Sequence, residues 1–249
     1  MTLNLVGPHA LVTGGASGIG LAIVNGLAEA GARVIIGDID ETAGNAVASQ
    51  LTDGMFRHLD VTDIGAIRSL ADFATRTWGS LDILVNCAGG SLPRPFFETD
   101  EEQWRKVIDL NLYGAMRCSH AFGPAMAAKR AGRIINISSG AGLHGQIGQA
   151  AYSAAKGGVN AFTKVLAREL AFSNVTANAV CPGATETPPM RKFIETAEGR
   201  AFTARIAATI PMGRFAQPED IASIVVFLAS KGAGYITGEL ISVSGGVGM

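Results

Sequence analysis

The chain has 249 residues, of which 48% are hydrophobic, so it can bury a substantial core in one domain or at most two. Charged residues make up only 16% and the formal net charge is −1. The chain therefore has no excess of positive charge that would favour binding to nucleic acid or to an anionic membrane. The 32 glycines, about 13% of the chain, exceed a usual share of about 7% and need an explanation.

Metal, redox and membrane signals are weak. We expect buried free thiols, because the three cysteines are far apart and form no C-x-x-C pair: Cys87, Cys118 and Cys181. We expect no metal, because the four histidines have no ligand spacing: His9, His58, His120 and His144. No apolar run approaches the roughly 18 residues of a membrane span, and the first residues lack the basic start of a signal peptide. These features predict a cytoplasmic protein without a membrane partner.

Short runs rich in Val and Ile alternate with helix-length amphipathic segments along the whole chain. The predicted strands are Ala10–Thr13, Arg33–Gly37, Met55–Leu59, Asp82–Val85, Arg133–Ile137, Thr176–Val180 and Leu240–Val243. This alternation is typical of a Rossmann-type α/β fold, a doubly wound parallel sheet of about seven strands with helices on both faces.

The chain shows no internal repeat or low-complexity linker, so we expect one domain over residues 1–249. The segment Thr185–Arg214 separates the sixth predicted strand from a helix predicted at Pro218–Ser230. Its length and position favour a mobile lid over a second domain. Apolar lid residues at helix-like spacing either close over a substrate or only pack the lid onto the body: Phe193, Ile194, Phe202 and Ile206. The basic residues of the predicted lid either bind a phosphate of an acyl-CoA or form a solvent-exposed helix face: Arg191, Lys192, Arg200 and Arg205.

A glycine-rich segment follows the first predicted strand, where an open parallel sheet binds its ligands. It reads Thr13-Gly14-Gly15-Ala16-Ser17-Gly18-Ile19-Gly20 and leads into an apolar-periodic helix. Gly14 permits a tight turn, Gly18 lets the backbone approach a pyrophosphate, and Gly20 lets the helix pack against the sheet. The pyrophosphate is expected on the helix N-terminus, next to Ser17 and Ile19.

Asp38 ends the second predicted strand. A carboxylate there accepts hydrogen bonds from the adenosine ribose and repels a 2′-phosphate, and neither Ser17 nor Ile39 supplies a cation for that phosphate. The sequence therefore predicts NAD(H) rather than NADP(H). The alternative is that Asp38 only caps the next helix. Asp60 and Val61, after the third strand, lie beside the adenine or cap a helix in the same way.

Tyr152 stands at the start of a strong helical pattern, four residues before Lys156, so the two side chains share one helix face. An unperturbed tyrosine has a pKa of about 10, but a cation within about 4–6 Å lowers a pKa by one to three units. The spacing therefore favours Tyr152 as an acid/base. Such a pair also occurs on ordinary surface helices.

Taken together, the motifs of the chain resemble those of the short-chain dehydrogenase/reductase family, single-domain type, over nearly the whole length. The motifs are Thr13-Gly14-x-x-x-Gly18-x-Gly20, Asn86-Cys87-Ala88-Gly89, Asn111, Ser139, Tyr152-x-x-x-Lys156 and Pro182-Gly183-x-x-x-Thr187. The resemblance implies hydride transfer between C4 of nicotinamide and the carbinol carbon of a secondary alcohol, without a metal.

The same resemblance implies a catalytic role for four residues. Tyr152 exchanges a proton with the substrate oxygen, Ser139 makes a hydrogen bond to that oxygen, and Lys156 lowers the pKa of Tyr152 and binds the nicotinamide ribose. Asn111 holds a water that links Lys156 to solvent, or else only bonds the backbone of its own helix. Ser138 is the competing serine, but Ser139 has the thirteen-residue spacing to Tyr152 that matches the family.

The resemblance also implies further cofactor contacts: Asn86, Ala88, Gly89, Pro182, Gly183, Thr185 and Thr187. Pro182 and Gly183 shape the nicotinamide ring site, and Thr187 and the Thr185 backbone contact the carboxamide. Cys87 departs from the family, which usually has a second Asn there. His144 and Gln149 line the substrate pocket or are ordinary loop residues.

The resulting hypothesis is an NAD-dependent dehydrogenase of a secondary alcohol, with a cyclic alcohol and a hydroxyacyl-CoA as the two candidate substrates. The segments Cys181–Thr187 and Ile236–Gly246 resemble those of alicyclic hydroxyacyl-CoA dehydrogenases. One rival is a 3-oxoacyl-thioester reductase acting on a carrier-protein or CoA thioester, which normally uses NADPH, and another is a catalytically silent NAD-binding sensor or scaffold. Family members commonly form homotetramers through the helices that contain Asn111 and Tyr152, and we expect the same here.

Overall fold

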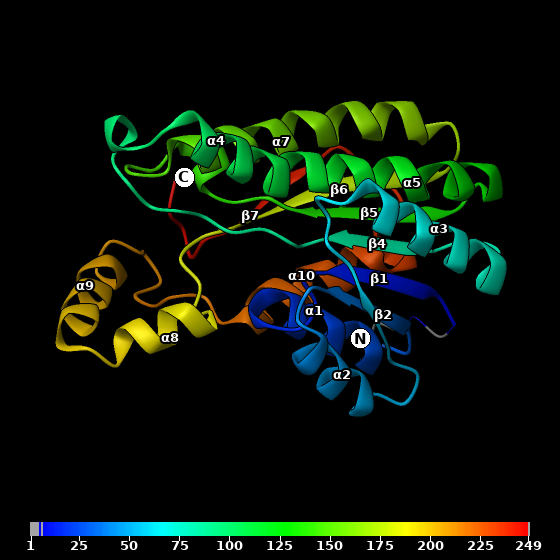
Figure 1. Ribbon diagram of the computed structural model, residues 1–249, viewed down its shortest axis with the longest axis horizontal. Coiled ribbons are helices and arrows are strands. Elements are labelled where there is room, and N and C mark those ends of the chain that lie inside the picture. The colour runs from blue at the N-terminus through cyan, green and yellow to red at the C-terminus, as the bar shows by residue number, and fades with distance from the viewer. Residues whose placement is uncertain (1–4, 6, 249) are drawn as a thin grey trace.

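The computed structural model describes residue 5 and residues 7–248 of the chain. Seven strands form one parallel sheet in the order β3-β2-β1-β4-β5-β6-β7 (Figure 1). The strands are β1 His9–Thr13, β2 Arg33–Asp38, β3 Met55–His58, β4 Ile83–Asn86, β5 Gly132–Ile137, β6 Val175–Pro182 and β7 Leu240–Val243. This sheet confirms the predicted Rossmann-type fold.

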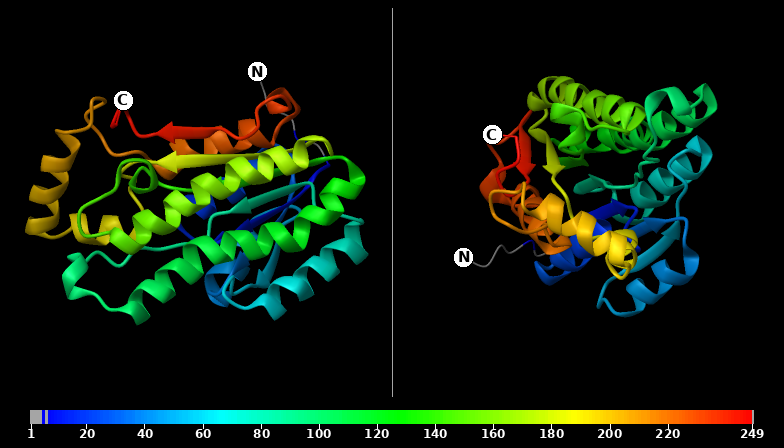
Figure 2. Two further views of the ribbon diagram at one scale, coloured as in Figure 1. Left: turned by 90° about the horizontal axis from the view of Figure 1, so that it is seen from above. Right: turned by 90° about the vertical axis from the view of Figure 1, so that its left-hand side faces the viewer.

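Helices cover both faces of the sheet (Figures 1 and 2). One face carries α1 Gly18–Glu29, α2 Glu41–Ser49 and α10 Pro218–Ala229, and the other carries α3 Ile64–Trp78, α4 Glu101–Ile108, α5 Gly114–Lys129 and α7 Ala150–Ala171. Shorter elements are the 3₁₀ turns Phe96–Glu98 and Lys231–Ala233, the π-helical turn Asp109–Tyr113, and the helices α6 Ala141–His144, α8 Pro188–Ile194 and α9 Ala197–Ala207.

The core explains the low charge of the chain. Ala10 and Val12 of β1 pack toward α1 and α10, whereas Leu11 between them packs toward α3 and α5. All three side chains are fully buried. Central strands of a parallel sheet are covered on both faces, so they consist almost entirely of apolar residues.

A polar network crosses the core close to the ends of β4 and β5. Asn86 Nδ2 donates to Asn136 Oδ1 at 2.8 Å and to Ser119 Oγ at 3.1 Å. Asn136 Nδ2 donates to Thr163 Oγ1 at 2.9 Å. These buried bonds join β4 and β5 to α5 and α7, and they hold together the elements that carry the candidate site.

Helices α8 and α9 project from the body beyond the ends of the strands (Figures 1 and 2). The two ends of the predicted lid are joined, because Ala216 N donates to the carbonyl of Ala184 and Glu186 N donates to the carbonyl of Ala216, both at 2.9 Å. The segment predicted as a lid is therefore tied at its base, and α8 and α9 extend outward from it.

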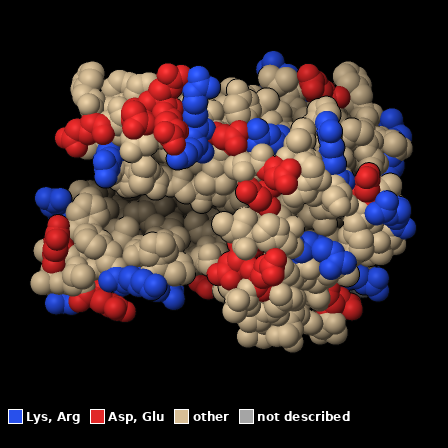
Figure 3. All heavy atoms as spheres, in the orientation of Figure 1, with Lys and Arg blue, Asp and Glu red and all other residues tan. Residues whose placement is uncertain are grey.

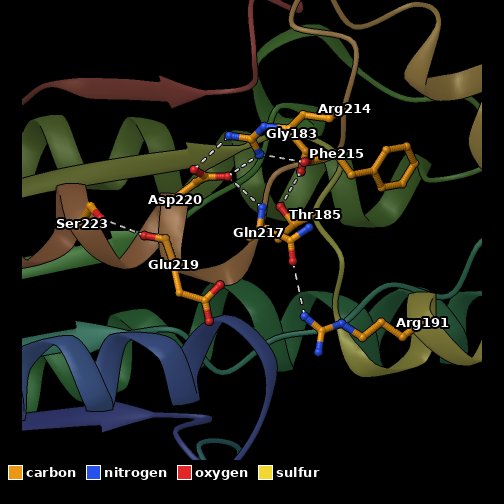
Figure 4. A network of polar contacts seen from close by, with 9 residues as sticks. All are labelled: Gly183, Thr185, Arg191, Arg214, Phe215, Gln217, Glu219, Asp220 and Ser223. Atoms are coloured by element: carbon orange, nitrogen blue, oxygen red, sulfur yellow. Dashed lines mark hydrogen bonds and ion pairs between the residues drawn. The ribbon is translucent and has the colours of Figure 1, made fainter.

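Polar side chains fix this base onto α10 (Figure 4). Arg214 donates to both carboxylate oxygens of Asp220, at 2.6 and 3.1 Å. Asp220 also accepts from the backbone N–H of Gln217 at 2.8 Å, and Gln217 Oε1 accepts from Arg191 of α8 at 3.3 Å. The first turn of α10 thus connects the start and the end of the lid.

Aromatic contacts hold the two lid helices together. Phe193 of α8 and Phe202 of α9 meet edge to face, with ring centroids 5.8 Å apart, and the Arg205 guanidinium lies 5.7 Å from the Phe202 ring. Arg200 donates to the carbonyl of Glu195 at 2.7 Å. Two of the apolar and two of the basic side chains singled out in the sequence therefore contact other residues of the segment 185–214.

Candidate active site

Lys156 is the most deeply buried charged side chain of the candidate site. It lies one turn after Tyr152 on α7, is 4% exposed, and its Nζ donates to the carbonyl of Ile137 at 2.8 Å. No Asp or Glu pairs with it in the described part of the chain. Burial therefore lowers the pKa of Lys156 to about 8.

The Tyr152 phenol is half-buried, and its pKa is raised rather than lowered. Burial is the main cause, and a hydrogen bond with Ser139 acts in the opposite direction. The Lys156 Nζ lies 5.6 Å from the centroid of the Tyr152 ring and is engaged by the Ile137 carbonyl. The Tyr152 pKa is thus raised in the chain itself, because desolvation of the phenolate outweighs the hydrogen bond with Ser139. The expectation that Lys156 lowers this pKa stays a prediction.

The two serines after β5 have different surroundings. Ser138 is buried, donates from its backbone N–H to the carbonyl of Val180 at 2.7 Å and from Oγ to the carbonyl of Lys156 at 3.1 Å. Ser139 Oγ accepts from the backbone N–H of Ala141 at 3.1 Å and lies close enough to the Tyr152 hydroxyl to affect its pKa. Ser138 therefore fastens β5 to α7, and Ser139 is the serine next to the phenol.

Asn111 lies in the π-helical turn and is 2% exposed. Its Nδ2 donates to the carbonyls of Val107 at 2.9 Å and Gly90 at 2.8 Å, and its Oδ1 accepts from Gly90 N at 3.2 Å. It therefore bonds its own helix and also fixes the loop after β4. π-helical turns occur frequently at functional sites.

Gly89 has no room for a side chain. A Cβ built there would lie 2.6 Å from Asn111 Oδ1 and 3.3 Å from Lys156 Nζ. Gly89 thus lies close to both polar groups, and a side chain there would collide with Asn111.

The glycine segment after β1 forms a tight cradle. Gly14 has φ +67° and Gly18 has φ +54°. A Cβ on Gly20 would lie 1.9 Å from the Gly14 carbonyl oxygen, so α1 begins directly against the loop. Ser17 precedes α1 as its N-cap but makes no side-chain capping bond, and Ile19 is partly buried against the core. The uncapped start of α1 fits the pyrophosphate of a dinucleotide.

Asp38 lies across this loop at the end of β2. Its Oδ2 accepts from Ala16 N at 3.0 Å, and its Oδ1 accepts from Asp40 N at 3.1 Å. Asp40, not Asp38, caps α2, accepting from Ala43 N at 2.9 Å. The capping alternative for Asp38 is therefore wrong, and its carboxylate lies beside the cradle, next to the exposed Ile39.

Asp60 and Val61 do not cap a helix either, because Asp63 caps α3. The Asp60 carboxylate accepts from the backbone N–H of Thr62 at 2.8 Å and from its hydroxyl at 2.7 Å, and these bonds lower its pKa. Val61 is buried, and a Cβ on Gly114 at the start of α5 would lie 2.8 Å from it.

The loop after β4 is held by Thr13, which the sequence indicated only as the start of the glycine motif. The Thr13 hydroxyl accepts from the backbone N–H groups of Cys87 and Ala88, both at 3.0 Å. The Asn86 side chain points into the core network instead, where its Nδ2 donates to Ser119 and Asn136. Burial raises the pKa of the Cys87 thiol to about 12, which keeps it protonated.

Pro182 and Gly183 end β6 and begin the loop that leads to the lid. A Cβ on Gly183 would lie 2.9 Å from Ser244 Cα. The Thr185 hydroxyl donates to the Gly183 carbonyl at 3.0 Å, and Thr187 is the N-cap of α8. A Cβ on Gly18 would lie 3.7 Å from the Thr187 methyl carbon, so the start of the lid lies beside the glycine loop.

The two predicted substrate residues are in different places. His144 ends α6, and a Cβ on Gly248 would lie 2.1 Å from its Nε2, so the imidazole contacts the end of the chain. Gln149 and Tyr152 line one pocket together with α4. Figure 3 shows a hollow between α4 and the α8–α9 segment, with uncharged residues at its floor and charged ones around its rim.

Within residue 5 and residues 7–248, no cluster of His, Cys, Asp or Glu could hold a metal ion. Nor is any helix in these residues long and apolar enough to cross a membrane.

Comparison with known proteins identifies the protein family to which the chain belongs. A family model described as enoyl-(acyl carrier protein) reductase matches residues 14–248. The 2,3-dihydroxy-2,3-dihydro-p-cumate dehydrogenase of Pseudomonas putida is 43% identical over 249 residues, which cover 98% of this chain and 95% of the relative. The 3-oxoacyl-(acyl-carrier-protein) reductase of Vibrio cholerae is 43% identical over 248 residues, which cover 99% of this chain and 100% of the relative.

Among solved structures, a variant of the actinorhodin polyketide ketoreductase with NADPH is similar, with a TM-score of 0.92 and 36% identity over 97% of each chain. Each match extends over nearly the whole chain, as the sequence motifs predicted. The chain belongs to the short-chain dehydrogenase/reductase family.

Proposed function

We propose that this enzyme is an NAD(H)-dependent dehydrogenase that interconverts a ring-borne secondary alcohol and its ketone. Oxidoreduction of alcohols and ketones follows from membership of the family, and the P. putida relative is named for a ring diol. The observation that carries the proposal is the Tyr152 phenol, whose ring centroid lies 5.6 Å from the Nζ of the buried Lys156, with Ser139 beside it.

Residues of the chain itself carry out the proton transfer to and from the substrate oxygen. Burial keeps Tyr152 protonated at neutral pH, so in reduction its hydroxyl donates to the forming alkoxide, while Ser139 donates a hydrogen bond to the same oxygen. In oxidation Tyr152 must first lose its proton, so that direction becomes faster as pH rises. Lys156, with a pKa of about 8, is mostly a cation at pH 7 and stabilises the phenolate that reduction leaves behind. The bound nicotinamide supplies or accepts the hydride.

The preference for NAD(H) is supported by Asp38. Its carboxylate lies beside the glycine cradle and already accepts from Ala16 N, so a ribose hydroxyl can donate to it, whereas a 2′-phosphate would be repelled. Ser17 and Ile39, the residues expected next to a 2′-phosphate at Asp38, carry no positive charge. Asp60, Val61, Ala88 and Gly89 would then line the adenosine and nicotinamide ends, with Pro182, Gly183, Thr185 and Thr187 on the lid side.

We further propose that residues 1–249 act as one domain with the segment 185–214 as a substrate lid, and that the protein is located in the cytoplasm.

We also propose a homotetramer. It is supported by exposed apolar side chains on and next to α5 and α7: Tyr113, Met116, Val165 and Phe172. Light scattering should give the mass of four chains, and the mass of one chain would refute the tetramer.

The rival function is reduction of 3-oxoacyl thioesters, since the V. cholerae relative is as similar as the P. putida one. Asp38 is the observation against it, because that activity normally requires NADPH. The catalytically silent sensor is disfavoured because Asn111, Ser139, Tyr152 and Lys156 are all present.

Replacing the phenol separates an enzyme from a silent binder. Tyr152→Phe should lower kcat for alcohol oxidation at least about 1,000-fold, because no proton acceptor remains at the substrate oxygen. Its dissociation constant for NADH, measured by fluorescence titration, should stay within about threefold. Tyr235→Phe changes an exposed tyrosine and serves as the control. Unchanged turnover in Tyr152→Phe would contradict the proposed role.

Cofactor choice tests Asp38. We expect kcat/KM with NADH to exceed that with NADPH by about 100-fold or more, because the carboxylate and a 2′-phosphate repel each other. Asp38→Ser should reduce this ratio to below about ten, whereas Asp40→Ser, two residues away, should leave it unchanged. A wild-type enzyme that reduces an acetoacetyl thioester faster with NADPH than with NADH would favour the rival function.

A further inference from the structure

The loop of residues 183–187, which follows β6, lies directly beside the glycine cradle. A Cβ on Gly18 would lie 3.4 Å from Pro188 Cδ and 3.7 Å from the methyl carbon of Thr187. In the proposed function the cradle holds the pyrophosphate of the cofactor and this loop holds its nicotinamide. The affinity for the whole dinucleotide therefore depends on how the loop is placed relative to the cradle.

A second stretch of backbone holds this loop from its other side. Ala216 N donates to the carbonyl of Ala184, and the carbonyl of Ala216 accepts from Glu186 N, both at 2.9 Å. Thr185 lies between these two bonds, and its backbone pairs with that of Ala216 as in a parallel sheet. The place of Thr185 thus follows the place of Ala216.

Ala216 is fixed in turn by an ion pair between residues on either side of it in the sequence (Figure 4). Arg214 donates to both carboxylate oxygens of Asp220, at 2.6 and 3.1 Å, and to the carbonyl of Phe215 at 2.9 Å. The same carboxylate accepts from the backbone N–H of Gln217 at 2.8 Å. One ion pair therefore holds both neighbours of Ala216.

The Asp220 carboxylate belongs to the first turn of α10, and α10 packs closely on α1. A Cβ on Gly26 of α1 would lie 3.1 Å from the Val226 side chain and 3.8 Å from Ala222 Cβ. Ile221 of α10 is fully buried in the core that the two helices share. Since α1 begins at the glycine cradle, the ion pair links the loop after β6 to the helix on which the pyrophosphate is expected.

We infer that Arg214 and Asp220 are positioning residues for the cofactor, because their ion pair holds the loop of residues 183–187 at a fixed distance from the glycine cradle. This inference rests on the proposed function and adds two residues to it. Neither of them is among the proposed cofactor contacts, so the pair acts through Ala216 and Thr185. Both side chains are partly exposed, so we expect the modest effect of a surface ion pair with two parallel hydrogen bonds.

The test compares NADH with ADP-ribose, which lacks the nicotinamide ring, each titrated by calorimetry into the enzyme. Asp220→Ala should raise the dissociation constant for NADH about three- to tenfold, because the loop is no longer held at its distance from the cradle. The dissociation constant for ADP-ribose should stay within about twofold. Glu219→Ala is the matched control, because Glu219 is exposed and its carboxylate makes no bond to the other residues drawn in Figure 4.

A double-mutant cycle tests whether the two side chains act together. Arg214→Gln should raise the dissociation constant for NADH by about the same factor as Asp220→Ala, and the double variant should bind NADH no more weakly than either single variant. Arg214→Lys should retain part of the affinity, because it keeps the charge without the two parallel hydrogen bonds. Retained binding of ADP-ribose also shows that each variant is folded.

Three outcomes overturn the inference. One is an equal loss of affinity for NADH and ADP-ribose in Asp220→Ala, which would give the pair a structural role only. Another is no loss of affinity for either ligand, and the third is a double variant in which the two losses add. All three leave the proposed dehydrogenase in place. A wild-type enzyme that binds neither ligand would contradict the proposed function and this inference together.

Discussion

The burial of the Lys156 side chain is the constraint on which the site depends. A lysine enclosed without a carboxylate partner is unstable as a cation, and burial accordingly lowers its pKa to about 8. The Ile137 carbonyl at the end of β5 accepts one hydrogen bond from the Lys156 Nζ. The loop after β4 makes room for it, since a Cβ at Gly89 would lie 3.3 Å from its Nζ. The fold thus bears a cost in stability to keep a titratable amine beneath Tyr152.

The neighbours of Lys156 follow from this placement. Ser138 fastens the end of β5 to the Lys156 carbonyl, which leaves Ser139 one residue further on, beside the phenol. Tyr152, one turn earlier on α7, also lines a small pocket together with helix α4. The protein therefore places a proton donor close to a buried amine. The proposed chemistry requires that arrangement.

Much of this was predictable from sequence, because periodicity and glycine spacing are local. The strands agree with the prediction to within two residues at each end, and the Gly14 to Gly20 segment forms the expected cradle. Three properties depend on packing and were not predictable. The Tyr152 pKa is raised because α7 is buried, and Asn86 turns into a core network that joins four elements. The loop after β4 is held against the residues before α7 because the backbone N–H of Arg94 donates to the carbonyl of Gly148, 54 positions away.

The account is tested most directly by the pH dependence of stability in Lys156→Met. An amine with a pKa of 10.5 in the unfolded chain and about 8 in the folded one costs about 3 kcal/mol below pH 8, and this cost disappears as pH rises toward 10.5. Urea unfolding at equal protein concentration should therefore show that replacing the lysine is more favourable at pH 7 than at pH 10, by about 2 to 3 kcal/mol relative to wild type. An equal effect of the substitution at both pH values would show that Lys156 keeps an ordinary pKa, and would contradict the account.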